Sequence, residues 1–365
     1  MRQSVEERQE RILLLVKERG SLRVAQLADE LGISAVTTRR HVEALAEQGL
    51  LRRAHGSVAW PDAPAADPAP LPGQQRGAAS SAVLGLVVPA AYYYYAEVIR
   101  GVKAAANAAG ARLVLGISDY RPEEDAAQIA SMLDTGVHGL LLTPNWAADT
   151  PTAEEEGRIL GLGVPTVLLE RRAASGSAAA ELDRVCTDHV HGACAAVRHL
   201  AGLGRRRIAL LARENTPTAG YVATGYRTGL AALGLTAPMT AAETAAAADF
   251  EARLRRIPDL VADGRVDAAL VHTDTDALVL LQHLQARGLR VPEDIALVAY
   301  DDEMAALADV PLTAVAPPKQ ALGEAAVGLL LSRLAEQPGT ASPRRHLDLL
   351  PQLHVRASTR VAAEG

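Results

Sequence analysis

Residues 266–302 read VDAALVHTDTDALVLLQHLQARGLRVPEDIALVAYDD, with one apolar run at each end of an amphipathic stretch. The runs 266–272 and 294–300 have the length and composition of buried strands. The stretch near 275–287 has the pattern of an amphipathic helix. Two apolar strands joined through a helix pair in parallel and are covered on both faces. This stretch therefore predicts an α/β fold.

The same alternation extends back to Ala82. The apolar runs are VLGLVVP, ARLVLGIS, HGLLLTP, PTVLLE, RVCT and RRIALLA. Helical stretches stand between the runs, near 96–109, 122–135, 153–162, 219–233 and 249–262 and from Asp188 to Leu203. Parallel sheets of this kind bind ligands outside the carboxyl ends of their strands.

The chain of 365 residues is long enough for two or three domains. Residues 1–58 are charged and helical, 59–80 are rich in Pro, Ala and Gly, and 81–365 carry the α/β alternation. The net charge of -6 hides an asymmetry, because residues 1–58 hold ten Lys/Arg against eight Asp/Glu. We predict a small DNA-binding domain at 1–58, a linker at 59–80 and a larger α/β domain at 81–365 that does not touch DNA.

Residues 1–58 have the pattern of a winged helix-turn-helix. A helix over Val5–Arg19 ends at Gly20, and a second short helix, VAQLADEL, follows. A third helix begins after an N-cap at Ser34, and LLRRAHGSVAW forms two short strands around a turn. On the third helix Thr38, Val42 and Leu45 face inward, and the opposite face presents Val36, Thr37, Arg39 and Arg40.

The third helix has the position of a recognition helix in a DNA major groove. Arginine and threonine there reach base edges or phosphates, and arginines on the wing reach the backbone or minor groove. The predicted DNA contacts are Ser34, Thr37, Arg39, Arg40, Arg52 and Arg53. Two other interpretations remain: Ser34 is a helix cap only, or the whole module contacts protein rather than DNA.

Residues 8–56 resemble the DNA-binding domain of DeoR-type bacterial repressors. This chain has His41 where the family usually has Asp, and Thr38 where it has an aliphatic residue. The first difference alters local charge and the second slightly weakens the core. Neither removes the arginines expected to face DNA.

Residues 82–360 resemble the effector domain of LacI/GalR-type repressors, which are similar to periplasmic sugar-binding proteins. The matching segments include AEVIRGVKAAANAAGARLVLGIS, HLAGLGRRRIALLA and GLRVPEDIALVAYDDEMAALADVPLTAV. The resemblance implies a two-lobed, periplasmic-binding-protein-like type I domain with parallel sheets and three crossovers. It assigns 82–188 and 317–336 to one lobe and 205–300 to the other, with a hinge motion closing them on a small polar ligand.

The linker lacks the hinge helix that LacI-type proteins insert into the minor groove. Coupling between effector and operator would then depend on dimer geometry or linker tension. Val222 stands where family members often carry Arg, which argues against a strongly anionic effector.

The predicted ligand contacts follow strands or match family positions. They are Tyr93, Tyr94, Trp146, Arg171, Asp188, Thr273, Asp274 and Asp301. Carboxylates accept hydrogen bonds from sugar hydroxyls, and aromatic rings stack on sugar faces. Structural alternatives stay open: Asp301 and Asp274 as turn or helix caps, Arg171 in an ion pair between the lobes, and Trp146 or the tyrosines packed on a surface.

Other functions find less support. Cys186, His189, His191 and Cys194 lie close together, but cysteines in a buried strand and helix behave as small apolar residues, so we expect no metal and no cofactor. No nucleotide-binding or hydrolase motif is present, so we expect no enzyme. The charged N-terminus does not resemble a signal peptide, and no apolar run reaches membrane-span length, so we expect a cytoplasmic protein.

The sequence therefore predicts a homodimeric transcription regulator, expected to repress, whose binding to double-stranded operator DNA responds to a small molecule. A sugar or sugar-like effector is expected. Alternatives are a nucleoside or purine effector, a cytosolic solute-binding protein, and an enzyme acting on glycosides.

Overall fold

The computed structural model describes residues 11–13, 15–16, 21–23, 27–28, 30, 35–47, 51–54, 57–59, 82–146, 151–213, 216–239, 249–337 and 342–360. The chain divides into two compact units, Met1–Gln75 and Arg76–Gly365. Among the described helices, none is long and apolar enough to cross a membrane.

The first unit contains a helix and a small antiparallel sheet. The elements are β1 (Ser21–Arg23), α3 (Ala35–Glu47), β2 (Arg52–Ala54) and β3 (Ser57–Ala59). The sheet order is β1-β3-β2, so the predicted pairing of β2 with β3 is confirmed and β1 adds a strand that was not predicted. Most of the helix expected at 5–19 and almost all of the linker lie outside the described residues.

Among the described residues of this unit, a buried apolar cluster contains Ile12, Val16, Leu27, Val42, Leu45, Leu51 and Val58. Thr38, Val42 and Leu45 are all buried on α3, as their helical spacing predicted.

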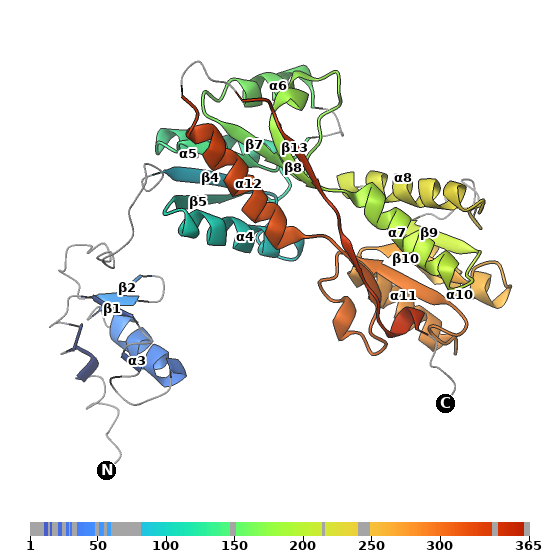
Figure 1. Cartoon of the computed structure of the whole chain (residues 1–365). Coiled ribbons are helices and arrows are strands. Elements are labelled where there is room, and N and C mark those ends of the chain that lie inside the picture. The colour runs from blue at the N-terminus through green and yellow to red at the C-terminus, as the bar shows by residue number, and fades with distance from the viewer. Residues whose placement is uncertain are drawn as a thin grey trace, which may run out of the picture. The chain divides into compact units, whose positions relative to one another are not determined.

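The second unit has two lobes (Figure 1). The first lobe holds a six-stranded sheet of β4 (Val83–Val88), β5 (Arg112–Ile117), β6 (Gly139–Leu142), β7 (Thr166–Leu169), β8 (Asp183–Thr187) and β13 (His346–Leu349). The strand order is β13-β8-β7-β6-β4-β5, and every neighbouring pair is parallel. The prediction of a parallel sheet is confirmed here.

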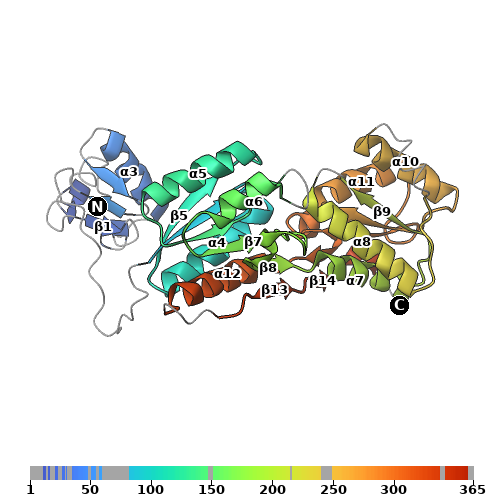
Figure 2. The same cartoon turned by 90° about the horizontal axis from the view of Figure 1, so that it is seen from above.

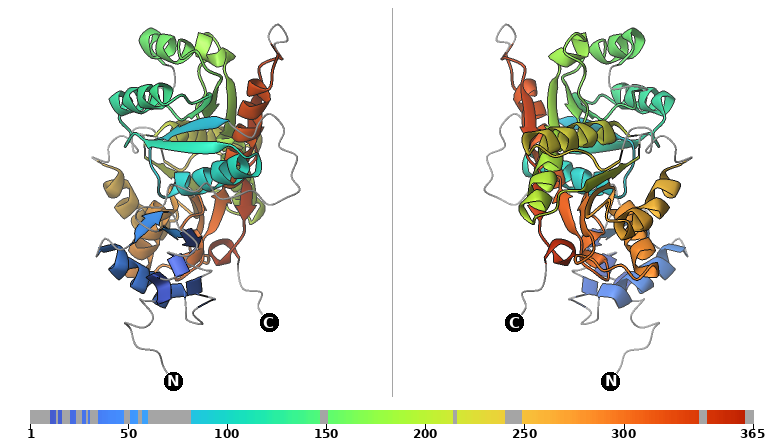
Figure 3. Two further views of the ribbon diagram at one scale, coloured as in Figure 1. Left: turned by 90° about the vertical axis from the view of Figure 1, so that its left-hand side faces the viewer. Right: turned by 90° about the vertical axis from the view of Figure 1, so that its right-hand side faces the viewer.

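Helices cover both faces of this sheet (Figure 3). The helices are α4 (Tyr94–Ala108), α5 (Pro122–Asp134), α6 (Ala153–Leu160) and α12 (Lys319–Leu334). Leu84 and Leu86 of β4 share one core with α4 and α12, whereas Val83 and Val87 share another with α5 and α6. Alternate residues of one fully buried strand therefore pack in opposite directions, which explains its continuous apolar sequence.

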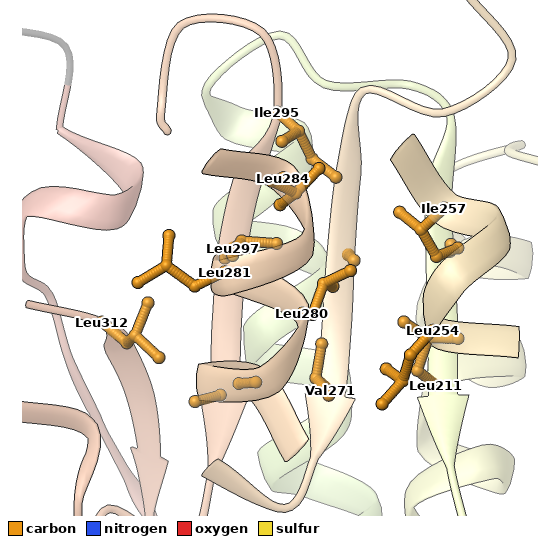
Figure 4. Packing of buried hydrophobic residues seen from close by; sticks show 14 of the residues in the cluster. Leu211, Leu254, Ile257, Val271, Leu280, Leu281, Leu284, Ile295, Leu297 and Leu312 are labelled. Carbon is orange, nitrogen blue, oxygen red and sulfur yellow. The ribbon is translucent and has the colours of Figure 1, made fainter. Parts of the chain in front are cut away.

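The second lobe repeats this arrangement. Its strands are β9 (Ile208–Ala212), β10 (Ala268–His272), β11 (Ala296–Tyr300), β12 (Thr313–Ala316) and β14 (Gln352–His354), in the order β14-β12-β11-β10-β9. Only β14 pairs antiparallel. The helices are α7 (His189–Gly202), α8 (Pro217–Ala232), α10 (Phe250–Ala262) and α11 (Asp274–Ala286). Figure 4 shows leucines and isoleucines of α10 and α11 packed on this sheet.

The chain passes between the lobes three times, from β8 to α7, from β12 to α12 and from β13 to β14 (Figure 2). The crossovers implied by the resemblance are thus present. The described residues also include the short 3-10 helices η2 (Ala178–Glu181), η3 (Ala305–Leu307) and η4 (Ala357–Thr359). Strands β13 and β14 were not predicted, because both are short and only half buried.

Candidate effector site and DNA-binding face

A cavity of about 210 Å³ lies between the two lobes. It is lined by Tyr93, Tyr94, Tyr95, Tyr120, Glu170, Arg171, His189, Thr216, Pro217, Thr218, His272, Thr273 and Asp301. These residues follow or end the strands β4, β5, β7, β8, β9, β10 and β11. The cavity therefore occupies the place where parallel α/β sheets bind ligands, and it takes residues from both sheets.

The backbone is unusual around this cavity. Six non-glycine residues have positive φ: Tyr93, Asp119, Tyr120, Glu170, Asp301 and Asp302. Four of the six line the cavity, and the other two are their chain neighbours. Such conformations are costly for residues with a β-carbon and concentrate at functional sites.

Two tyrosines at the start of α4 hold acidic groups on either side of the cavity. The Tyr93 hydroxyl donates to the carboxylate of Asp274, the first residue of α11 in the second lobe. The Tyr94 hydroxyl donates to Glu170, which follows β7 in the first lobe. Burial and the neighbouring carboxylates raise the pKa of both tyrosines far above the ordinary range, so both hydroxyls remain donors.

Glu170 is fully supplied with donors. Its oxygens accept from the Thr187 backbone N–H at 3.0 Å and the Thr187 hydroxyl at 2.6 Å, and His189 Nε2 lies 3.5 Å away. Burial alone would raise the pKa of Glu170, but the bonds from His189, Thr187 and Tyr94 outweigh it and lower that pKa to about 2. The carboxylate is therefore charged and serves to position its neighbours.

Arg171 lines the cavity but already donates to two carbonyls. Its Nε bonds Pro144 O at 2.7 Å, and its Nη1 bonds Glu170 O at 2.9 Å. The guanidinium thus ties the end of β7 to the segment that follows β6. No inter-lobe ion pair involves Arg171 among the described residues.

Asp301 differs from the other acids of the cavity. It is 4% exposed, and its carboxylate has no hydrogen-bond partner within the described part of the chain. Burial, together with the charges of Asp274 and Glu170, raises the pKa of Asp301 to about 6, although His189 and Lys319 oppose this shift. An unpaired buried carboxylate facing a cavity is the group that most needs a ligand.

Thr273 and Asp274 have different roles. Thr273 lines the cavity and makes a capping box with Asp276 at the start of α11. Asp274 is fully buried, and its second oxygen accepts backbone N–H groups from Glu303, Met304 and Ala305. Asp274 therefore anchors the loop after β11 and reaches the cavity through Tyr93.

The structure does not bring Trp146 or Asp188 into this cavity. The Asp188 carboxylate accepts from His191 N at 2.9 Å and caps α7. Trp146 lines a separate, mostly apolar cavity of about 240 Å³ between α5 and α6. Its indole N–H is buried without an acceptor within the described residues.

Sequence reasoning missed several lining residues. They are Tyr95, Tyr120, Glu170, His189, Thr216, Pro217, Thr218 and His272. Glu170, His189 and His272 stand at strand ends, so the strand-end rule could have found them. His272 is 3% exposed, and burial followed by repulsion from His189 lowers its pKa to about 4, so the ring is neutral near pH 7.

Val222, Cys186 and Cys194 do not line this cavity. Val222 is fully buried in the core of the second lobe and supplies no cation. Cys186 is buried in β8 with its thiol directed to Arg171 O, and Cys194 bonds Gly225 O from α7. No group of three metal-ligating side chains occurs among the described residues.

The structure describes part of the predicted DNA-binding face. Arg40 is exposed and Thr37 is half-buried on α3, opposite the buried Thr38. The backbone places Arg39 on α3 and Arg52 and Arg53 on β2, but their side chains lie outside the described part of the structure. Ser34 also lies outside the described residues.

Comparison with known proteins identifies both parts of the chain. A DeoR-like helix-turn-helix domain model matches residues 8–63, and a periplasmic binding protein-like domain model matches residues 197–359. The HTH-type transcriptional regulator CelR of Thermobifida fusca is 32% identical over 274 residues, which cover 73% of this chain and 76% of that protein. The chain belongs to the LacI-type family of transcriptional regulators.

Another transcriptional regulator and a solved regulator structure are also similar to this chain. The ribose operon repressor of Escherichia coli (strain K12) is 29% identical over 269 residues, covering 73% of this chain and 78% of that protein. The solved structure of a CelR–cellobiose complex has a TM-score of 0.62 and 25% identity, covering 89% of this chain and 91% of that one. The chain is thus a DNA-binding regulator with a ligand-binding domain, and its relatives are regulators rather than enzymes, as expected.

Proposed function

We propose that this chain represses transcription as a homodimer in the cytoplasm and that a sugar or sugar-like molecule, bound between the lobes, changes its affinity for operator DNA. The observation that carries this proposal is the unpaired Asp301 carboxylate facing a cavity lined by both lobes. A ligand that satisfies Asp301 also contacts the lobe opposite, so binding favours closure. The cellobiose bound in the related CelR structure supports a sugar.

The effector half of this proposal is tested by a thermal-shift screen of sugars and nucleosides on the full chain. A sugar that binds the folded state raises the melting temperature, and the shift grows with the logarithm of the sugar concentration once that concentration exceeds Kd. The Asp301→Ala variant should fold but lose that shift. A shift from nucleosides alone would replace the sugar by the alternative effector class.

The operator half is tested by fluorescence anisotropy with duplexes from the chain's own upstream region. Arg39→Ala combined with Arg40→Ala should abolish binding while the effector shift remains, because α3 lies in the DNA-binding unit. Any residual binding should depend less on salt concentration, because two phosphate contacts are lost. Unchanged binding with an unchanged salt slope would mean that α3 is not the recognition helix.

Dimerisation is supported by the edge of the first lobe. Strand β5 is the terminal strand of the six-stranded sheet, and its Leu115 and Ile117 are exposed. Exposed apolar side chains on an edge strand favour association with another chain. Leu115→Lys combined with Ile117→Lys should therefore convert a dimer to a monomer in light scattering, and operator affinity should fall because each head then binds one half-site.

A further inference from the structure

Negative charge is in excess around the cavity between the lobes. Glu170 and Asp301 line it, and Asp274 bonds the lining residue Tyr93. A fourth carboxylate, Glu303, lies one step further out and pairs with Lys319, which donates to the backbone carbonyl of Asp301. Two permanent cations stand against them, Arg171 and Lys319. His272 is neutral because burial lowers its pKa to about 4. Carboxylates outnumber cations whichever charge His189 carries.

Three of the four carboxylates are already satisfied by the protein. Glu170 accepts from Tyr94 and Thr187, and Asp274 accepts from Tyr93 and from backbone N–H groups. Glu303 pairs with Lys319. The uncompensated charge is therefore located at Asp301.

Neither cation is available to Asp301. The Arg171 guanidinium donates to two carbonyls, and Lys319 Nζ donates to the backbone carbonyl of Asp301 and to the Glu303 carboxylate. The charges of His189 and Lys319 act on Asp301, but no described residue donates a hydrogen bond to its carboxylate, so a ligand can supply that bond. Burying that carboxylate without one is unfavourable, as its pKa of about 6 indicates.

The rest of the lining is suited to a cation as well. Four tyrosines line the cavity, and aromatic ring faces attract positive charge. One of them already does so, because Lys319 Nζ lies 5.4 Å from the centre of the Tyr94 ring. The arginine that family members often carry at position 222 is replaced here by a buried valine, so no additional cation repels such a ligand.

We propose that the effector is an amino sugar or a similar aminated polyol, whose protonated amine binds the Asp301 carboxylate while its hydroxyls meet the tyrosines and threonines of the cavity. This inference rests on the proposed sugar-responsive function and specifies the ligand class of that same site. The cavity of about 210 Å³ has room for a sugar ring.

The test is calorimetric titration of the full chain with matched sets of probes near pH 7: glucosamine, glucose and N-acetylglucosamine, and the corresponding galactose and mannose sets. At least one amine should bind about tenfold tighter than both its parent and its acetylated form, because the charge-assisted bond is available only to the ammonium group. The acetylated probe keeps the nitrogen but removes its charge.

The variant Asp301→Asn keeps the shape of the side chain and should abolish this preference, leaving amine and parent sugar within about twofold. Asp119→Asn, an exposed carboxylate beside the lining residue Tyr120, is the matched control and should keep the preference. Equal affinity of amine and parent for the unmodified chain would overturn the inference but leave the sugar effector standing. No binding of any sugar would overturn both.

Discussion

The Tyr93 hydroxyl donates a hydrogen bond to the Asp274 carboxylate, and this bond joins the first lobe to the second directly across the effector cavity. Tyr93 immediately precedes α4, whereas Asp274 begins α11. Asp274 is fixed independently by N–H groups of the loop after β11. Moving the two lobes apart at this point would therefore break a polar contact.

Tyr93→Phe should weaken effector binding by roughly tenfold, about 1.4 kcal/mol, which is near the low end of the value of a hydrogen bond to a charged group. The substitution removes the bond that closure forms but leaves the ring in place. Calorimetry with the effector found by the screen measures the loss, and small-angle scattering of the free chain should show a larger radius of gyration. Tyr92→Phe is the control, because Tyr92 is 70% exposed. Equal affinities for the two variants would contradict this role of the bond.

Asp301→Asn should stabilise the ligand-free chain above about pH 6. The folded-state pKa of Asp301 is about 6 against an ordinary value of 3.8, so folding favours the protonated acid. Below the ordinary pKa both states are protonated and no difference is expected. As the pH rises through the folded pKa the stability of the unmodified chain falls, by up to roughly 3 kcal/mol, whereas the amide does not titrate.

Denaturation in urea from pH 4 to 8 measures this difference. The adjacent Asp302 provides a control of opposite sign. Burial would raise its pKa, but ion pairs with Arg356 and His354 outweigh this and lower it. Asp302→Asn should therefore destabilise the chain above pH 4, with the loss shrinking as the pH falls. A pH-independent gain at Asp301 would mean that its carboxylate is not penalised by burial.

The α/β core could be predicted because its strands are buried on both faces. Continuous apolar runs such as VDAALVH are required where helices cover both faces of a sheet. The helices between these runs show the regular spacing of apolar residues that is typical of amphipathic helices. Strands β1, β13 and β14 have three or four residues each and no such run. Their pairing depends on partners distant in sequence, which local pattern does not reveal.

The residues of the cavity could be predicted only by the rule that ligands bind at the carboxyl ends of parallel strands. That rule brought together Tyr93, Arg171 and Asp301, but it also selected Trp146 and Asp188, which face elsewhere. The direction of a side chain after a strand depends on the local backbone, as the positive φ of Asp301 shows. The sequence also left two roles open for Asp274, a helix cap or a ligand contact. In the structure Asp274 anchors the loop after β11 and accepts a hydrogen bond from Tyr93, and neither contact can be read from the local sequence.

Arg333→Met should destabilise the first lobe by about 3–5 kcal/mol, because it leaves the fully buried Asp183 carboxylate with only the exposed Arg344, 3.7 Å away, as an ionic partner. The guanidinium of Arg333 on α12 donates through two nitrogens to Asp183 at the start of β8. Chemical denaturation measures the change. Arg287→Met breaks a pair with Asp259 whose side chains are 58% and 57% exposed, and should cost less than about 1 kcal/mol. Similar losses from the two variants would contradict the importance of burial.

Two glycines of α12 should respond to alanine in opposite directions. A β-carbon at Gly323 would lie 2.4 Å from Val98 O and 2.7 Å from Val102 N, so α4 and α12 would have to separate, at a cost of about 1–3 kcal/mol. A β-carbon at Gly328 would meet nothing within 4 Å, so Gly328→Ala should stabilise the helix by roughly 0.5–1 kcal/mol through its lower backbone entropy. Thermal unfolding of both variants measures the two changes. Because helix propensity is equal at both positions, a gain at Gly323 would mean that the close approach of α4 to α12 does not constrain this lobe.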